Sequence, residues 1–222
     1  IKMNKSKWIT VDGIDGCGKT TSINFIKENL ESSGEKVTIV RAIGGGVNGH
    51  LFRELLINSE LDVNTTALLV ASCHTNCFQQ ITKLLDEGYT VIQDRSIASY
   101  YAYNYMVPYS GNYLRPNDSS SLLFNGFLNN RKIINRQPDI SIFIDVDVER
   151  AKQRMLERNE ELKYTDKGSV DFFSKLRESF IEYYSLFIKD SSFVLIDNNK
   201  NLEDLKNNLK ITIDRFYSTY RS

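Results

Sequence analysis

A glycine-rich turn separates an apolar run from a helical rhythm between residues 8 and 26, in the sequence WITVDGIDGCGKTTSINFI. Gly13, Gly18, Lys19 and Thr20 satisfy the pattern GxxxxGKT, directly after a predicted strand and directly before a predicted helix. Glycines let backbone N–H groups turn inward, and the following helix N-terminus adds partial positive charge. The pattern therefore predicts a loop that wraps a polyphosphate, with Lys19 at the outer phosphates and Thr20 on magnesium. A flexible surface turn that matches by accident is the alternative, and the strand–loop–helix order disfavours it.

Short apolar runs recur along the chain, and each is followed by a longer segment of helical periodicity. This alternation is typical of repeated βα units with a parallel sheet. The predicted strands are residues 7–12, 36–41, 89–94, 140–145 and 192–196. The fold class is therefore predicted to be α/β, a P-loop NTPase three-layer sandwich with a five-stranded parallel sheet and helices on both faces.

Two segments near the carboxyl end carry apolar residues at spacings of three and four. Residues 173–187 and 202–216 are therefore predicted to be amphipathic helices packed on the sheet. Residues 104–137 are rich in Asn, Ser and Tyr and hold two of the three prolines, which predicts loops plus one helix near 121–135. Because no linker or repeat interrupts the chain, we expect a single domain over residues 1–222.

The composition argues against several classes of protein. Twenty-eight basic residues balance 28 acidic ones, so no overall positive field would attract nucleic acid. No run of about 18 apolar residues exists for a membrane span, and the opening IKMNKSKW lacks the apolar core of a signal peptide. Cys17, Cys73 and Cys77 form an odd set that indicates free thiols in a reducing compartment. These features predict a soluble, cytoplasmic protein.

Other proteins with this kind of glycine loop require signals that the chain lacks. A GTPase needs a guanine-reading NKxD after a late strand, and the nearest candidate, residues 199–202, reads NKNL without the acid. A motor or ATPase module would carry a clearer water-activating site. Both classes are therefore disfavoured.

Four segments, in the same order and at similar separations, resemble thymidylate kinases. They are VDGIDGCGKTT (residues 11–21), the Asp94-Arg95 pair, IASYYAY (97–103) and PDISIFIDV (138–146). The resemblance covers nearly the whole chain. It implies a P-loop kinase domain that uses ATP and Mg²⁺, accepts dTMP to give dTDP, and assembles as a homodimer.

Two residues at the end of the third predicted strand suit phosphoryl transfer by their chemistry. The reaction needs in-line positioning and positive charge on the migrating group. Arg95, at a strand's carboxyl end beside the loop, is placed to hold a second phosphate. Asp94 suits a carboxylate that orients magnesium through water. The alternative is an ordinary Asp-Arg surface pair.

The resemblance implies further roles in the site. Asp15, inside the loop, matches an acid that contacts the metal and the acceptor region. Arg41 matches an arginine that would clamp the acceptor phosphate, although an exposed arginine at a strand end is the alternative. The implied donor-binding set is Gly13, Asp15, Gly16, Cys17, Gly18, Lys19, Thr20 and Thr21, and the implied metal-binding pair is Thr20 and Asp94.

The segment from residue 149 to 171 resembles the family's mobile lid, which closes over the donor phosphates and excludes water. Because the loop carries no arginine, the resemblance implies that transition-state charge comes from Arg154 and Arg158, with Lys163 third. A solvated helix face is the alternative for each. The predicted catalytic set is Lys19, Asp15, Arg95, Arg154 and Arg158.

The part of the chain that corresponds to the base pocket departs from the family. Where thymidylate kinases carry a phenylalanine that stacks on thymine and an arginine that hydrogen-bonds it, this chain has Val70 and His74. Valine cannot stack on a base as phenylalanine does, and histidine is a shorter and weaker hydrogen-bond donor than arginine. Three glycines in RAIGGG (residues 41–46) stand where the family has a proline and glycines. They either let the backbone approach the acceptor closely or form a simple turn. The predicted acceptor-binding set is Asp15, Arg41, Val70, His74, Arg95, Ser99, Tyr100 and Tyr103.

Tyr103 matches a tyrosine that, in some members, disfavours a ribose 2′-hydroxyl, which favours deoxyribose. A deoxynucleoside kinase is an alternative, but it needs a carboxylate after the second strand, and residues 42–44 read AIG. A kinase of a modified pyrimidine nucleotide fits the changed pocket. A non-catalytic nucleotide-binding regulator is the remaining hypothesis.

Overall fold

The computed structural model describes residues 6–103, 125–126, 136–157, 169–188 and 192–219. Five strands form one parallel sheet in the order β2-β3-β1-β4-β5. Their bounds are β1 Trp8–Asp12, β2 Val37–Arg41, β3 Thr90–Asp94, β4 Ile140–Asp145 and β5 Phe193–Asp197. The predicted five-stranded parallel sheet is confirmed.

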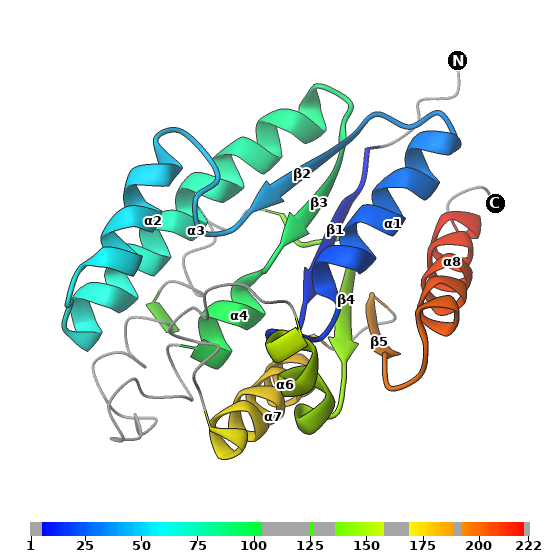
Figure 1. Cartoon of the computed structure of the whole chain (residues 1–222). Coiled ribbons are helices and arrows are strands. Elements are labelled where there is room, and N and C mark those ends of the chain that lie inside the picture. Colours follow the sequence, from blue (N-terminus) through cyan, green and yellow to red (C-terminus); the bar gives the residue numbers. More distant parts are fainter. Residues whose placement is uncertain (1–5, 104–124, 127–135, 158–168, 189–191, 220–222) are drawn as a thin grey trace.

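Helices cover both faces of this sheet. They are α1 Lys19–Ser32, α2 Gly49–Asn58, α3 Val63–Asp86, α4 Ile97–Tyr101, α6 Val148–Glu157, α7 Val170–Phe187 and α8 Leu202–Ser218. Figure 1 shows α1 and α8 on one side of the sheet and α3, α4 and α7 on the other, while α2 packs on the outside of α3. The α/β three-layer arrangement is therefore confirmed.

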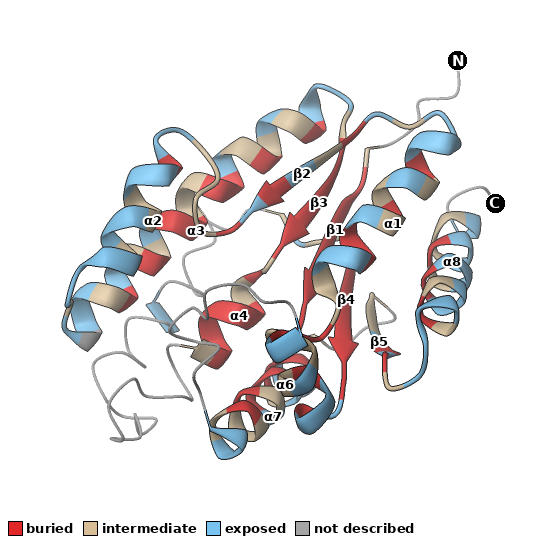
Figure 2. Cartoon of the chain, in the orientation of Figure 1, coloured by how far each residue is buried: buried red, intermediate tan, exposed pale blue. Residues whose placement is uncertain are grey.

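The core lies along the three central strands. Every residue of β1, β3 and β4 is buried, as the red strands of Figure 2 show. Strands covered on both faces need apolar side chains in both directions, and for this reason they read as nearly continuous apolar runs. From α7, Phe180 and Tyr184 pack their rings against Phe143 of β4.

The two predicted amphipathic helices are present as α7 and α8. Their interior apolar positions, such as Leu176 and Leu209, are fully buried. Leu202 and Phe187 are instead exposed, because Leu202 begins α8 and Phe187 ends α7, beyond the area that the sheet covers. The predicted helix near 121–135 lies outside the described residues apart from 125 and 126.

All five strands end in a charged residue at the same edge of the sheet. These residues are Asp12, Arg41, Asp94, Asp145 and Asp197. The strand register pairs Asp94 with Arg41 on one side and with Val11 on the other. In open α/β sheets ligands bind outside the carboxyl ends of the strands. The fold therefore gathers its charged strand ends where a site is expected.

Among the described helices, none is both long and apolar enough to cross a membrane. The three cysteines are free and buried, and burial raises the pKa of the Cys17 thiol to about 11. Cys17 is therefore a neutral packing group at ordinary pH, and the prediction that all three cysteines are free thiols is confirmed.

Candidate active site

The loop from Gly13 to Gly18, called the glycine loop below, joins β1 directly to α1. A side chain at Gly16 would collide with the backbone carbonyl of Ala151, because α6 crosses closely over the loop. α1 begins at Lys19, so the unpaired N–H groups of its first turn open beside the loop. Thr20 and Thr21 are exposed on that turn. The predicted strand–loop–helix context is confirmed, and it suits an anion.

Lys19 reaches across the strand ends to Asp94. Its Nζ lies 2.7 Å from one carboxylate oxygen of Asp94, and Nε of Arg41 lies 3.2 Å from the other. Burial alone would raise the pKa of the Asp94 carboxyl, but Lys19, Arg95 and Arg41 outweigh burial and hold the pKa below its ordinary value. Asp94 is therefore an anion that gathers three cations at the mouth of the glycine loop.

Arg95 brings the strand end and the glycine loop together. One guanidinium nitrogen lies 2.5 Å from Oδ1 of Asp15, and another donates to the Gly13 carbonyl at 3.2 Å. The Tyr103 hydroxyl donates to the second oxygen of Asp15 at 3.1 Å, and the guanidinium lies over the Tyr103 ring, 5.1 Å from its centre. Three predicted site residues, Asp15, Arg95 and Tyr103, thus form one cluster.

Arg95 adopts the left-handed backbone conformation, with φ 69°. This conformation is unusual for a side chain other than glycine, asparagine or aspartate, so its surroundings must hold it. The buried carboxylate of Asp12 accepts hydrogen bonds from the Ser96 N–H at 2.9 Å and the Ser99 hydroxyl at 2.7 Å. Asp12 thereby fastens the turn that carries Arg95 to the start of α4, the helix in which Ser99 lies.

Sequence reasoning missed Asp12, whose only signal is an acid at the end of an apolar run. It also missed Arg53, which lies on α2 and donates to the Ile43 carbonyl at 3.5 Å. Burial and then the nearby charge of Arg41 lower the pKa of Arg53, while Asp94 raises it. Arg53 therefore belongs to the same group of charges, and no local motif marks it because its neighbours lie on other elements.

The glycines of RAIGGG form a turn anchored to α3. The Gly46 N–H donates to the side chain of Gln80 at 2.6 Å, and the Asn76 amide donates to the Gly45 carbonyl at 3.3 Å and to the Val47 carbonyl at 2.9 Å. A side chain at Gly46 would collide with Asn76. These contacts support the interpretation as a turn, which carries the chain from β2 into α2.

The predicted lid is described only in part. Arg154 lies on α6, where its guanidinium donates to the Asn198 carbonyl at 3.1 Å, at the rim of the glycine loop. Arg158 and Lys163 lie outside the described residues. The lid therefore stays a prediction, with one of its basic residues seen beside the site.

Comparison with known proteins adds to this geometry. The family described as "Thymidylate kinase" matches residues 11–209 of the chain. The chain belongs to the thymidylate kinase family. It is 32% identical over 201 residues to the thymidylate kinase of Thermoanaerobacter sp. (strain X514), covering 89% of this chain and 92% of that one. It is 27% identical to that of Neisseria meningitidis serogroup B, covering 95% and 97%, and 31% identical to that of Rickettsia africae, covering 83% and 86%.

The two positions predicted to face the base lie inside the core. Val70 and His74 are both buried, with 3% and 1% of their surface exposed. The His74 ring stacks on Tyr100 with ring centres 5.7 Å apart, and the Tyr100 hydroxyl donates to the Ala67 carbonyl at 3.0 Å. Burial lowers the pKa of His74 to about 4, so the ring is neutral at ordinary pH. These residues are packed in the core, and a base contact for them stays a prediction.

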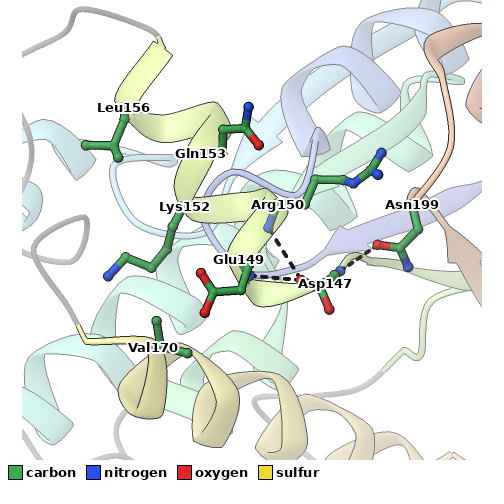
Figure 3. A pocket seen from close by; sticks show the side chains of 8 residues that line it. All are labelled: Asp147, Glu149, Arg150, Lys152, Gln153, Leu156, Val170 and Asn199. Carbon is green, nitrogen blue, oxygen red and sulfur yellow. Dashed lines mark hydrogen bonds between the residues drawn. The ribbon is translucent and has the colours of Figure 1, made fainter.

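A groove lies outside the glycine loop, between α6, the start of α7 and the segment after β5 (Figure 3). Its lining consists of Asp147, Glu149, Arg150, Lys152, Gln153, Leu156, Val170 and Asn199. Arg150 donates to the Lys200 carbonyl at 3.3 Å and so ties α6 to that segment. Among the predicted site residues that the structure describes, none lines this groove, and none of its lining residues belongs to the charged cluster at Asp94.

Proposed function

We propose that this chain is a nucleoside monophosphate kinase that transfers the γ-phosphoryl group of ATP to dTMP, giving dTDP. One observation carries the proposal beyond family membership. The cations of Lys19, Arg41 and Arg95 converge on Asp94 and Asp15 directly at the glycine loop. Such a cluster offers both a donor phosphate site and a place for a second phosphate close beside it.

On the donor side, the glycine loop and the first turn of α1 supply N–H groups to the phosphates, and Lys19 supplies positive charge. The Lys19 ammonium lies 2.7 Å from the Asp94 carboxylate at the glycine loop. When ATP binds, this ammonium would leave Asp94 and contact a phosphate oxygen instead. The Thr20 hydroxyl and the Asp94 carboxylate are hard oxygen ligands, the type that Mg²⁺ prefers. Bound there with ATP, Mg²⁺ would neutralise charge on the transferring phosphoryl group.

On the acceptor side, Arg41, Arg53 and Arg95 would hold the monophosphate. Its attacking oxygen is already an anion, so no strong general base is required. Asp15 orients Arg95 through their ion pair, and Tyr103 completes the orientation through its bond to Asp15. The arginines therefore reduce the repulsion between two anionic substrates and fix their distance.

For the lid, we propose that Arg154 and Arg158 add positive charge on closure and that closure excludes water, which otherwise accepts the phosphoryl group. For the base, Tyr103 would disfavour a ribose 2′-hydroxyl. The buried Val70 and His74 favour one further candidate, a nucleotide whose pyrimidine is modified, since the usual stacking and hydrogen-bonding side chains are replaced. Homodimer formation is part of the proposal and is measured by light scattering in solution.

A coupled assay of ADP release tests the proposal directly. Purified protein receives Mg·ATP with dTMP, dUMP, 5-hydroxymethyl-dUMP or thymidine, each at matched concentration. We expect dTMP to stimulate ADP release most strongly and thymidine not at all. Preferred turnover of 5-hydroxymethyl-dUMP would reassign the acceptor to a modified pyrimidine. Stimulation by thymidine alone would make the chain a nucleoside kinase, and ATP binding with no acceptor-dependent ADP release would make it a regulator.

A further inference from the structure

Asn198, two residues before Lys200 and directly after β5, makes a contact that crosses almost the whole chain. It is 4% exposed, and its side-chain nitrogen donates to the Cys17 carbonyl in the glycine loop at 2.7 Å. A carbonyl oxygen can only accept, so the nitrogen of the amide must face it. The segment after the edge strand is thus fastened to the glycine loop.

The backbone of Asn198 is itself held by two hydrogen bonds, and one of the two residues that make them is anchored in turn. Its backbone N–H donates to the Asp145 carbonyl of β4 at 2.8 Å, and its carbonyl accepts from Arg154 of α6 at 3.1 Å. Arg177 of α7 grips the Asp145 carboxylate through two hydrogen bonds, of 2.5 and 2.7 Å. The amide of Asn198 is therefore presented by a rigid frame rather than by a free loop end.

The contact fixes one peptide unit of the glycine loop. In a planar trans peptide the C=O and N–H bonds point in opposite directions. With the Cys17 carbonyl turned toward Asn198, the N–H of Gly18 is turned away from it. Gly18 has φ 90°, and without a side chain the peptide before it rotates at little cost unless something holds it. A Cβ at Gly18 would come within 2.6 Å of the Asn198 amide nitrogen, so this amide lies directly against the glycine.

We infer that Asn198 is a positioning residue for the donor phosphates, which aims the Gly18 N–H into the glycine loop by holding the Cys17 carbonyl. The role requires the phosphate-binding loop of the proposed function but not any particular acceptor. It acts on the part of the donor that carries the β-phosphate.

Two substitutions test this role. Asn198→Ala removes the donor and leaves the Cys17 carbonyl without it, and Asn198→Asp sets a carboxylate against that carbonyl. Calorimetry with Mg·ADP, which needs no turnover, should give a Kd raised about tenfold in Asn198→Ala, the size expected for one lost buried hydrogen bond. Asn198→Asp should weaken Mg·ADP further, because two acceptors repel each other. The Kd of AMP, which has no β-phosphate, should be unchanged in Asn198→Ala.

Asn201→Ala is the matched control. Asn201 caps α8 by accepting from the Asp204 N–H at 2.9 Å, so its loss lowers the melting temperature without touching the glycine loop. An unchanged Mg·ADP Kd is expected in this variant. Equal weakening of AMP and Mg·ADP in Asn198→Ala, or an unchanged Mg·ADP Kd, would overturn the inference. So would the absence of Mg·ADP binding in the wild-type protein. Normal Mg·ADP binding without turnover of dTMP would instead refute only the proposed function.

Discussion

The two ends of the candidate site are built in different ways. At the glycine loop, chain neighbours supply most groups, since Gly13 to Thr20 are consecutive and one strand and one helix orient them. On the side predicted to face the base, called the base side below, α3 and α4 bring together His74 and Tyr100, which are distant in sequence and stack inside the core. The loop leaves polar groups accessible to a ligand, whereas the aromatic rings on the base side are buried in the core. We therefore expect substitutions in the glycine loop to change the rate of phosphoryl transfer, and substitutions on the base side to change stability or the choice of base.

The largest effect should come from the loop. Lys19→Ala removes the ammonium that meets Asp94 and, on ATP binding, the donor phosphates. We expect kcat to fall about 10²- to 10³-fold, as for loss of one charge-stabilising donor, with little change in the melting temperature. Steady-state kinetics with dTMP provides the measurement. Lys27→Ala, on the same helix in an exposed pair with Glu31, should keep full activity. Retention of wild-type kcat in Lys19→Ala would contradict the assigned donor site.

The base side should instead respond to pH through stability. The folded-state pKa of His74 is about 4, below the ordinary value of 6.5. As pH falls, the unfolded chain takes up the proton first, so stability is full above about pH 7 and is lost progressively toward pH 4. Between pH 7 and pH 5 we expect a loss of about 2 kcal/mol in the free energy of unfolding.

Urea unfolding at the two pH values measures this loss for three proteins. His74→Phe should remove that component of the pH dependence, because the ring no longer titrates. His50→Gln, at the exposed second histidine, should retain it. If His74→Phe and the wild type lose equal stability between pH 7 and pH 5, the buried neutral histidine is not its source.

A smaller effect is expected at Arg53, which joins the acceptor side from α2. Arg53→Ala should raise KM for dTMP about tenfold and leave KM for ATP unchanged, since one charge-assisted contact is lost from the acceptor phosphate alone. Initial rates with each substrate varied in turn give both constants. The exposed neighbour Glu54→Ala is the control, and equal shifts in both constants would remove Arg53 from the acceptor side.

The smallest effect should follow Tyr100→Phe, which deletes only the hydroxyl that donates to the Ala67 carbonyl at 3.0 Å. The free energy of unfolding should fall by about 1 kcal/mol, the typical net value of one buried hydrogen bond. Urea unfolding measures it, and KM for ATP should stay at the wild-type value. A raised KM for ATP would show that the two ends of the site are coupled and do not respond separately to substitution.

Much of the fold could be predicted because its signals are local. Each strand was found within one residue at either end, since a buried parallel strand reads as an apolar run wherever it lies. The exposed Leu202 and Phe187 were not anticipated, because periodicity marks a helix face without saying where the sheet beneath it ends. The charged strand ends at Arg41 and Asp94 followed from the same reasoning, since parallel strands share one carboxyl edge.

Sequence alone determined the glycine loop, the order of strands and helices along the chain, and the place of Asp94 and Arg95 at the strand end beside that loop. Tertiary structure alone decided that Asp12 fastens the turn of Arg95 and that Arg53 lies near the charges of Arg41 and Asp94. It also decided that His74 is buried and that Asn198 holds the Cys17 carbonyl, 181 positions away in the sequence. The reason is the separation in sequence between the residues that make each contact. A motif encodes contacts between chain neighbours, whereas a contact between distant residues exists only once the sheet has fixed both of their positions.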